Sequence, residues 1–189
     1  PSRPWPTRGG STRFIEPGPG PTNVRDLLAR EDHAYFVTEP LEGRLRVTGE
    51  VKLRAQVSVT SPSSDLAALL VDVAPDGRHT MLVDGIRRVW WSVRAPHPSL
   101  QRRPGDTLTV SLGWTSYAFG EGHRIGLIVT GGNWPRFERN PQDGRMPSTD
   151  PSGGEVAEHR LRLNRESVLL LPLLAEGAEV ISKPGLGGD

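Results

Sequence analysis

The chain has 189 residues, a formal net charge of +1 and no cysteine, so it is long enough for one domain with a sizeable core. The near-neutral charge argues against a nucleic-acid partner or an anionic membrane surface, and the lack of cysteine excludes disulfides, thiolate metal sites and a cysteine nucleophile. Hydrophobic residues make up only 35% of the chain, whereas glycine (22) and proline (18) are abundant, which favours a turn-rich β-protein over a helical one.

Residues 1–30 are predicted to form a lead-in ahead of the folded domain. Seven glycine or proline residues occur between Gly9 and Pro21, which is too many for a regular element. Only residues 27–30 could form a short helical turn. We therefore expect the domain itself to cover residues 31–182, followed by a disordered tail at residues 183–189.

Short strands separated by turns are predicted through the middle of the chain. Apolar and polar residues alternate from residue 51 to residue 59, a period of two that predicts one buried and one wet face. Residues 66–73 are almost wholly apolar and would lie centrally in a sheet, before a turn at residues 75–77 (P-D-G). Residues 80–88 and 89–94 are interpreted as two further strands.

The C-terminal half continues the same pattern. Leu108, Val110 and Leu112 alternate with polar residues, and residues 138–154 form a long polar loop. Residues 156–163 and 168–173 complete the set of strands. Roughly nine short strands without a convincing helix predict an all-β antiparallel sandwich.

The most informative segment is residues 119–140, which read F-G-E-G-H-R-I-G-L-I-V-T-G-G-N-W-P-R-F-E-R-N. Gly120 and Gly122 permit a tight turn. The apolar run at 125–129 predicts a strand buried on both faces. Trp134 and Phe137 lie on either side of Pro135. The ring of Pro135 stiffens the exit from that strand and keeps the preceding residue out of a helix.

This segment resembles a signature of the C-terminal non-catalytic domain of X-Pro dipeptidyl-peptidase and cocaine-esterase (CocE/NonD) type serine hydrolases. Further motifs of that domain occur in the same order: a first strand at 35–42 (Y-F-V-T-E-P-L-E), a turn at 47–50 (V-T-G-E), a hairpin at 70–78 (L-V-D-V-A-P-D-G-R) and D-G-I-R-R at 84–88. The segment P-W-P-T-R-G-G at 4–10 is similar to the one that leads out of the family's catalytic domain.

The resemblance implies a jelly-roll β-sandwich of the galactose-binding-like kind and a partner, an N-terminal α/β-hydrolase catalytic domain that would carry the Ser-His-Asp triad. A nucleophile elbow of the form G-x-S-x-G is absent from the chain. We therefore assign no catalytic residue, metal ligand or cofactor to this chain. The expected function is to pack on the catalytic domain, help shape its active-site mouth and contribute to contacts in a homo-oligomer.

Three groups of residues are candidates for this role. Ser64, Asp65 and Leu66 occupy a turn that in the family approaches the active site, so they would form part of the pocket wall; alternatively, Asp65 caps backbone N–H groups of a plain turn. The aromatic residues are candidates for the interdomain interface: Trp90, Trp91, Trp134 and Phe137. The residues of the signature are expected to be structural: His123, Arg124 and Asn140. His123 is expected to bond to backbone or to Glu121.

One alternative from a different functional class stays open at this point. A free-standing carbohydrate-binding module can use the same fold, and exposed tryptophans could stack on sugars. No apolar run approaches the roughly 18 residues of a membrane helix, so no membrane contact is expected. The chain opens without a signal peptide or a methionine and is interpreted as a fragment, with any targeting signal upstream of Pro1. The cytoplasm is favoured, and the compartment stays open.

Overall fold

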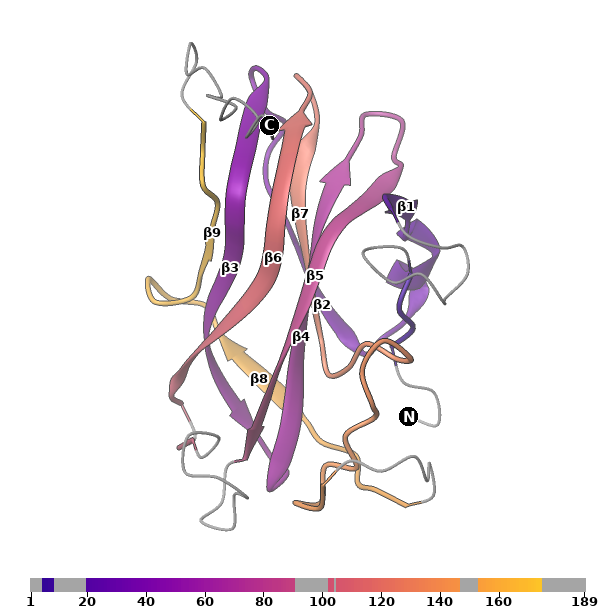
Figure 1. Ribbon diagram of the computed structural model, residues 1–189, viewed down its shortest axis with the longest axis vertical. Helices are drawn as coiled ribbons and strands as arrows, with labels where there is room; N and C mark the ends of the chain where they lie inside the picture. Colours follow the sequence, from indigo (N-terminus) through magenta and orange to yellow (C-terminus); the bar gives the residue numbers. More distant parts are fainter. Residues whose placement is uncertain (1–4, 9–19, 91–101, 104, 147–152, 175–189) are drawn as a thin grey trace, which may run out of the picture.

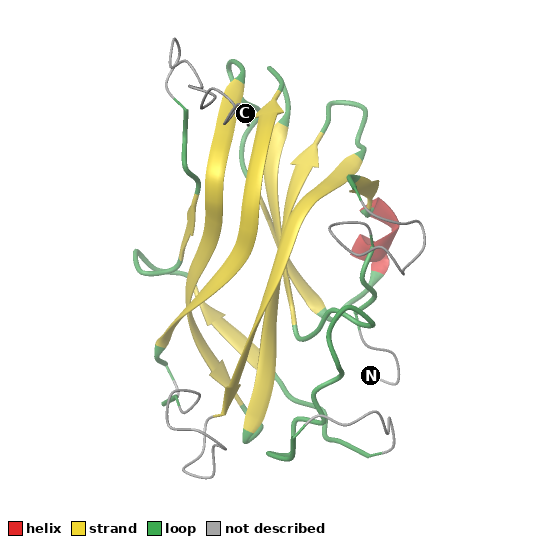
Figure 2. Cartoon of the chain, viewed as in Figure 1, coloured by secondary structure: helices red, strands yellow, loops and turns green. Residues whose placement is uncertain are grey.

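Two antiparallel sheets packed face to face make up the computed structural model, which describes residues 5–8, 20–90, 102–103, 105–146 and 153–174 (Figures 1 and 2). The first sheet has five strands in the order β1 (Thr22–Asn23), β5 (His79–Trp90), β4 (Ser63–Val73), β7 (Arg124–Thr130) and β2 (His33–Val37). The second has β6 (Thr107–Phe119), β3 (Leu45–Val59) and β8 (His159–Arg162), and β9 (Val168–Leu170) also pairs with β3. The predicted all-β, jelly-roll sandwich is confirmed.

The alternating pattern of β3 and β6 buries one face of the second sheet. Apolar side chains of β3 at Val51, Leu53, Ala55 and Val57 are all buried, and those of β6 at 108, 110 and 112 meet them in the same core. Their polar neighbours face outward, as the period of two predicts. Each large apolar side chain buried in this way stabilises the fold by about 1.5–3 kcal/mol.

Strand β4 is buried along its whole length because it has a core on each face. Leu66, Ala68 and Leu70 point into the sandwich. Leu69 and Val71 point to the other face of the five-stranded sheet, where a second cluster forms with the N-terminal segment. The continuous apolar run therefore predicts its central position correctly.

The second cluster contains part of the predicted lead-in. Trp5, Val24 and Leu27 are buried against the five-stranded sheet, and a 3₁₀ helix, η1 (Arg25–Ala29), carries Leu27. These segments lie on the outer face of the sheet in Figure 1. The division at residue 30 stays a prediction, and the predicted tail at 183–189 lies outside the described residues.

Two predicted features of local structure are wrong. The V-T-G-E motif at 47–50 is not a turn but part of β3, because it pairs with β6 without a break from Val47–Tyr117 to Glu50–Trp114. Residues 80–90 form one strand rather than two, since the pairing with β4 continues without a break from Arg88, opposite Asp65, to Val89, opposite Ser64. Residues 91–94 lie outside the described part of the chain.

The two sheets come into backbone contact at Gly85 of β5. A Cβ atom on Gly85 would lie 1.8 Å from Ser111 O and 2.9 Å from Leu112 Cα of β6. Only glycine leaves room for backbone atoms at this separation. The glycine of the D-G-I-R-R motif thus permits the contact between β5 and β6.

Candidate functional site

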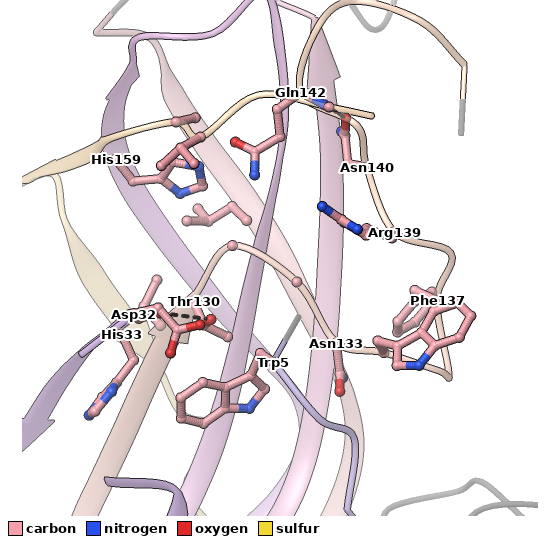
Figure 3. A pocket seen from close by; sticks show the side chains of 18 of the residues that line it. Trp5, Asp32, His33, Thr130, Asn133, Phe137, Arg139, Asn140, Gln142 and His159 are labelled. Carbon is pink, nitrogen blue, oxygen red and sulfur yellow. Dashed lines mark hydrogen bonds between the residues drawn. The ribbon is translucent and has the colours of Figure 1, made fainter. Parts of the chain in front are cut away.

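A pocket of about 360 Å³ lies at the end of the sandwich where β7 ends and where β2 and β8 begin (Figure 3). We call it the end pocket. Residues 131–142, which we call the exit loop, form much of its lining. Further lining residues come from distant parts of the chain: Trp5, Asp32, His33, Leu66, Thr130 and His159.

Residues 5–8, the described part of the predicted lead-in, pair directly with the exit loop. Trp134 N–H donates to Trp5 O over 2.8 Å, and Thr7 N–H donates to Trp134 O over 2.5 Å. The Thr7 hydroxyl also donates to Asn133 Oδ1 over 2.5 Å, and both side chains are buried. Because these groups are almost 130 positions apart in the sequence, the pairing fixes the start of the chain to the exit loop.

Asp84 of β5 holds the exit loop from the other side. Its buried carboxylate accepts hydrogen bonds from Asn133 Nδ2 and from the Arg136 guanidinium. The intervening Trp134–Pro135 peptide bond is cis. Three motifs that are separate in the sequence, P-W-P-T, D-G-I and N-W-P-R-F, therefore meet at one point.

A second set of bonds holds the far end of the exit loop. Arg88 donates to both oxygens of Asp65, over 2.7 and 2.8 Å, and Asn140 Nδ2 donates to Asp65 over 2.9 Å. Ser63 Oγ donates to Asn140 Oδ1 over 3.1 Å. Asn140 thus links Asp65 and Ser63 of β4 to the exit loop, and the structural role of the signature stays a prediction.

The prediction that Ser64, Asp65 and Leu66 form a turn is wrong. All three belong to β4 and are at most 2% exposed. Asp65 caps no turn, because its cross-strand neighbour Arg88 supplies a charged partner. Leu66 does line the end pocket, whereas Ser64 lies beneath His159.

His159 joins the two sheets at the end pocket. Its Nε2 atom lies 2.6 Å from Ser64 Oγ, so β8 of the second sheet contacts β4 of the first. Burial lowers the pKa of His159, and the nearby Asp65 charge only partly opposes this effect. The ring is therefore neutral and shares a hydrogen bond with the Ser64 hydroxyl, and this buried hydroxyl is suited to a structural bond rather than to nucleophilic attack.

His123 and Arg124 lie at the opposite end of β7 from the end pocket, so the structure separates them from Asn140. The partner of His123 is Asp72, at 2.8 Å, rather than Glu121. The Tyr117 hydroxyl also donates to Asp72, over 2.7 Å; burial, followed by the bond and the charge of Asp72, raises the pKa of Tyr117 to about 12. Arg124 donates to the backbone oxygen of Thr38 over 2.9 Å.

The four aromatic candidates for the interface occupy different positions. The prediction that Trp90 lies at the surface is wrong, because its side chain is 2% exposed and its Nε1 donates to Gly144 O inside the domain. Trp91 lies outside the described residues. Trp134 is 45% exposed, and Phe137 is partly exposed beneath the Arg136 guanidinium.

Several residues of the site were missed by sequence reasoning. Asp84 and Asn133 stood in quoted motifs, but only the fold shows that they bond to each other. Gln142, which lines the end pocket with a φ of 64°, carries no sequence signal. Trp114 of β6 is 78% exposed on the outer face of the second sheet. The glycine before it in the sequence was the available clue, and in the structure this glycine has a φ of 107°.

The described part of the chain contains no group of three or more His, Asp or Glu side chains placed to hold a metal ion. Among the same residues, none of the helical segments has the length and apolar character needed to cross a membrane.

The fold defines a class of protein, the antiparallel β-sandwich domains. The family model described as "X-Pro dipeptidyl-peptidase C-terminal non-catalytic domain" matches residues 11–165. The chain belongs to this family. The comparisons give no support to the carbohydrate-binding alternative.

Curated relatives agree with this assignment. The chain is 36% identical to the cocaine esterase of Rhodococcus sp. (strain MB1 Bresler) over 146 residues, which cover 76% of this chain and 25% of that protein. It is 28% identical over 142 residues to a putative Xaa-Pro dipeptidyl-peptidase of Streptomyces avermitilis, covering 52% of this chain and 21% of the relative. It thus spans a quarter or less of the length of these relatives.

Solved structures show the same fold. An aminopeptidase from the marine sediment archaeon Thaumarchaeota archaeon superposes with a TM-score of 0.72 at 24% identity, over 92% of this chain and 32% of that one. An alpha-amino acid ester hydrolase superposes with a TM-score of 0.67 at 25% identity, over 80% of this chain and 27% of that one.

Proposed function

We propose that this chain is the accessory sandwich of a larger serine hydrolase, which packs on an N-terminal catalytic domain and helps shape its active-site mouth. The observation that carries the proposal is the pairing of residues 5–8 with the exit loop. This pairing fixes where the chain arrives from upstream. A tether held at one place restricts how the two domains can be oriented.

The surface beside this tether is suited to contact another domain. Trp134 and Phe137 lie next to the lead-in and are partly exposed, and exposed aromatic side chains are enriched at protein interfaces. Leu66 lines the adjacent end pocket and would form part of a wall facing the catalytic domain. Because Asp84 and Asp65 hold both ends of the exit loop, this surface keeps its shape before docking.

The chain alone is proposed to be non-catalytic. Within the described residues, the one serine bonded to a histidine, Ser64, is 1% exposed and cannot reach a substrate. The parent would hydrolyse esters or amides, as the names of the relatives suggest for those proteins. A homo-oligomer stays a further prediction.

Assays of three proteins test this function. The 189-residue chain, the complete parent protein and the parent without these residues are compared on p-nitrophenyl esters and X-Pro-nitroanilides. We expect turnover only from proteins that contain the catalytic part, with kcat/KM lowered when the sandwich is removed. Turnover by the purified chain that titrates with a serine-directed phosphonate would refute the non-catalytic assignment. Unchanged kcat/KM and stability after removal would refute the accessory role.

A further inference from the structure

We propose that the end pocket binds an extended, positively charged polypeptide segment of the catalytic part of the same protein. This inference rests on the proposed function and names the occupant of one site within it. The evidence consists of unpartnered polar atoms, a backbone in a rare conformation, the charge of the rim and the position of the tether.

Three buried polar atoms without a hydrogen-bond partner belong to residues that line the end pocket. They are Trp5 Nε1, His33 Nδ1 and Gln142 Oε1. Trp5 is only 1% exposed, and a buried indole N–H normally finds an acceptor. A buried donor or acceptor left without a partner costs about 1–3 kcal/mol, so three in one pocket indicate that a polar group completes the site.

The arrangement of these atoms favours a chain segment over a small ion. Figure 3 shows Trp5 and Gln142 on opposite sides of the view, with the backbone that follows Thr130 passing between them. That backbone contains Gly131, which the His159 ring covers, and Gly132, where a Cβ atom would meet nothing within 4 Å. A polypeptide lying across the open backbone at Gly132 carries carbonyl oxygens for Trp5 Nε1–H and N–H groups for Gln142 Oε1.

Gln142 is held in its position at a cost to the fold. It is the one non-glycine residue of the described chain with a positive φ, 64°, a conformation that is uncommon for such residues. Asn140 Oδ1 accepts its backbone N–H over 2.8 Å, and Asn140 is itself bonded to Asp65. Strain that is supported in this way is concentrated at binding sites.

Carboxylates on the rim set the sign of the charge. Glu31, Glu138 and Glu155 line the pocket, are exposed and form no ion pair within the described residues. Asp32 is neutralised by Arg30 at 2.5 Å, and Arg139 is the one guanidinium among the described residues of the lining. An excess of negative charge favours a segment that carries lysine or arginine.

The tether determines which molecule supplies the segment. Trp5 lines the pocket, so a catalytic domain joined to the N-terminal side of this chain, as proposed above, would be attached beside the pocket. Covalent attachment raises the effective concentration of a nearby segment to the millimolar range. A weak contact is therefore sufficient when it comes from the same protein.

The test uses the 189-residue chain and short overlapping peptides that cover the coding sequence upstream of Pro1. Binding of the labelled chain to the peptide array identifies the segment, and titration of the ¹⁵N-labelled chain with that peptide locates it. We expect binding to be confined to peptides with a net positive charge. The Trp5 indole N–H signal should shift on titration, whereas that of the exposed Trp114 should not.

Two variants and a control separate binding from folding. Gln142→Gly removes the carboxamide and accepts the positive φ, so affinity should fall about tenfold while the melting temperature holds or rises. Trp5→Phe removes the indole N–H and should weaken binding similarly. Trp114→Phe, on the outer face of the other sheet, should leave binding unchanged.

Each remaining outcome overturns the inference. An array without a binding peptide, binding that prefers acidic peptides, or equal affinity for Gln142→Gly and the unmodified chain would each do so. Any of these results would refute peptide binding at the end pocket, and the accessory role would stand if removal of the sandwich from the parent still lowers kcat/KM. If removal leaves kcat/KM unchanged while the peptide still binds at Trp5, the accessory role alone is refuted.

Discussion

Buried carboxylates in the described part of the domain lie beside cations or hydrogen-bond donors. Asp65 faces Arg88 and Asp84 faces Arg136, while Asp72 is bonded by Tyr117 and His123. A buried charge without such partners would be costly. At the scale of single residues, these bonds hold the loops at both ends of the sandwich.

Removing the partner of Asp65 should therefore cost more than removing an exposed ion pair. Arg88→Ala leaves the carboxylate buried with only Asn140 as donor, and we expect a loss of about 3 kcal/mol in unfolding free energy. Arg160→Ala, which breaks an exposed pair with Glu158, should change stability by less than about 0.5 kcal/mol. Urea denaturation of both variants measures this, and equal losses would contradict the structural role of Asp65.

The buried His159 makes stability depend on pH. Its pKa is lowered in the fold from the ordinary 6.5, so below pH 6.5 the unfolded chain binds a proton more readily than the folded chain. Stability from this group is complete above pH 6.5 and is lost as pH falls toward the lowered pKa, by up to about 1.4 kcal/mol per pH unit.

His159→Gln should remove this part of the pH dependence. Because the other histidines are present in both proteins, the difference in melting temperature between variant and unmodified chain should shrink as pH falls from 7.5 to about 5. Differential scanning calorimetry at several pH values measures it. A difference that grows on acidification would show that His159 is charged in the fold.

At the scale of elements, close packing between the sheets depends on one glycine. Strands β5 and β6 belong to different sheets but approach within backbone contact at Gly85. Gly85→Ala would force the strands apart, because Ser111 O and Leu112 Cα are backbone atoms that cannot rotate away. We expect a loss of more than about 3 kcal/mol.

Gly43 supplies a matched control for this prediction. A Cβ atom at Gly43 meets nothing within 4 Å, so Gly43→Ala should change stability by less than about 1 kcal/mol and could raise it. Thermal unfolding of both variants gives the comparison. A Gly85→Ala protein as stable as Gly43→Ala would show that the two strands are not in contact.

Patterns that repeat along one element were predictable from the sequence, whereas contacts between elements were not. The alternation at 51–59 and the apolar run at 66–73 predicted β3 and β4 because burial alone produces them. The V-T-G-E segment was misjudged because Gly49 suits a turn or a strand equally, and pairing with residues 114–117 of β6 selects the strand.

The same difference between patterns along one element and contacts between elements applies to the candidate site. Asn140 and Trp134 were singled out because they stand in a recognisable signature. Asp84, Asn133 and Gln142 were missed because their roles depend on partners more than 40 positions away or on a backbone angle. The turn assigned to Asp65 was wrong for the same reason, since Arg88 lies on another strand.

At the scale of the whole molecule, the lead-in, β5 and the exit loop join at one end of the sandwich. This end contains the end pocket, the partly exposed Trp134 and residues 5–8 of the lead-in. The exposed Trp114 lies on the outer face of the other sheet. The account therefore predicts that a catalytic domain covers the first surface and leaves the second in contact with water.

Hydrogen–deuterium exchange tests this central claim most directly. The complete parent protein and the 189-residue chain are compared, peptide by peptide, under identical conditions. The account predicts slower exchange in the parent for the exit loop, residues 131–142, and no change for the outer residues of β6 around Trp114. Slower exchange around Trp114 with an unchanged exit loop would contradict it.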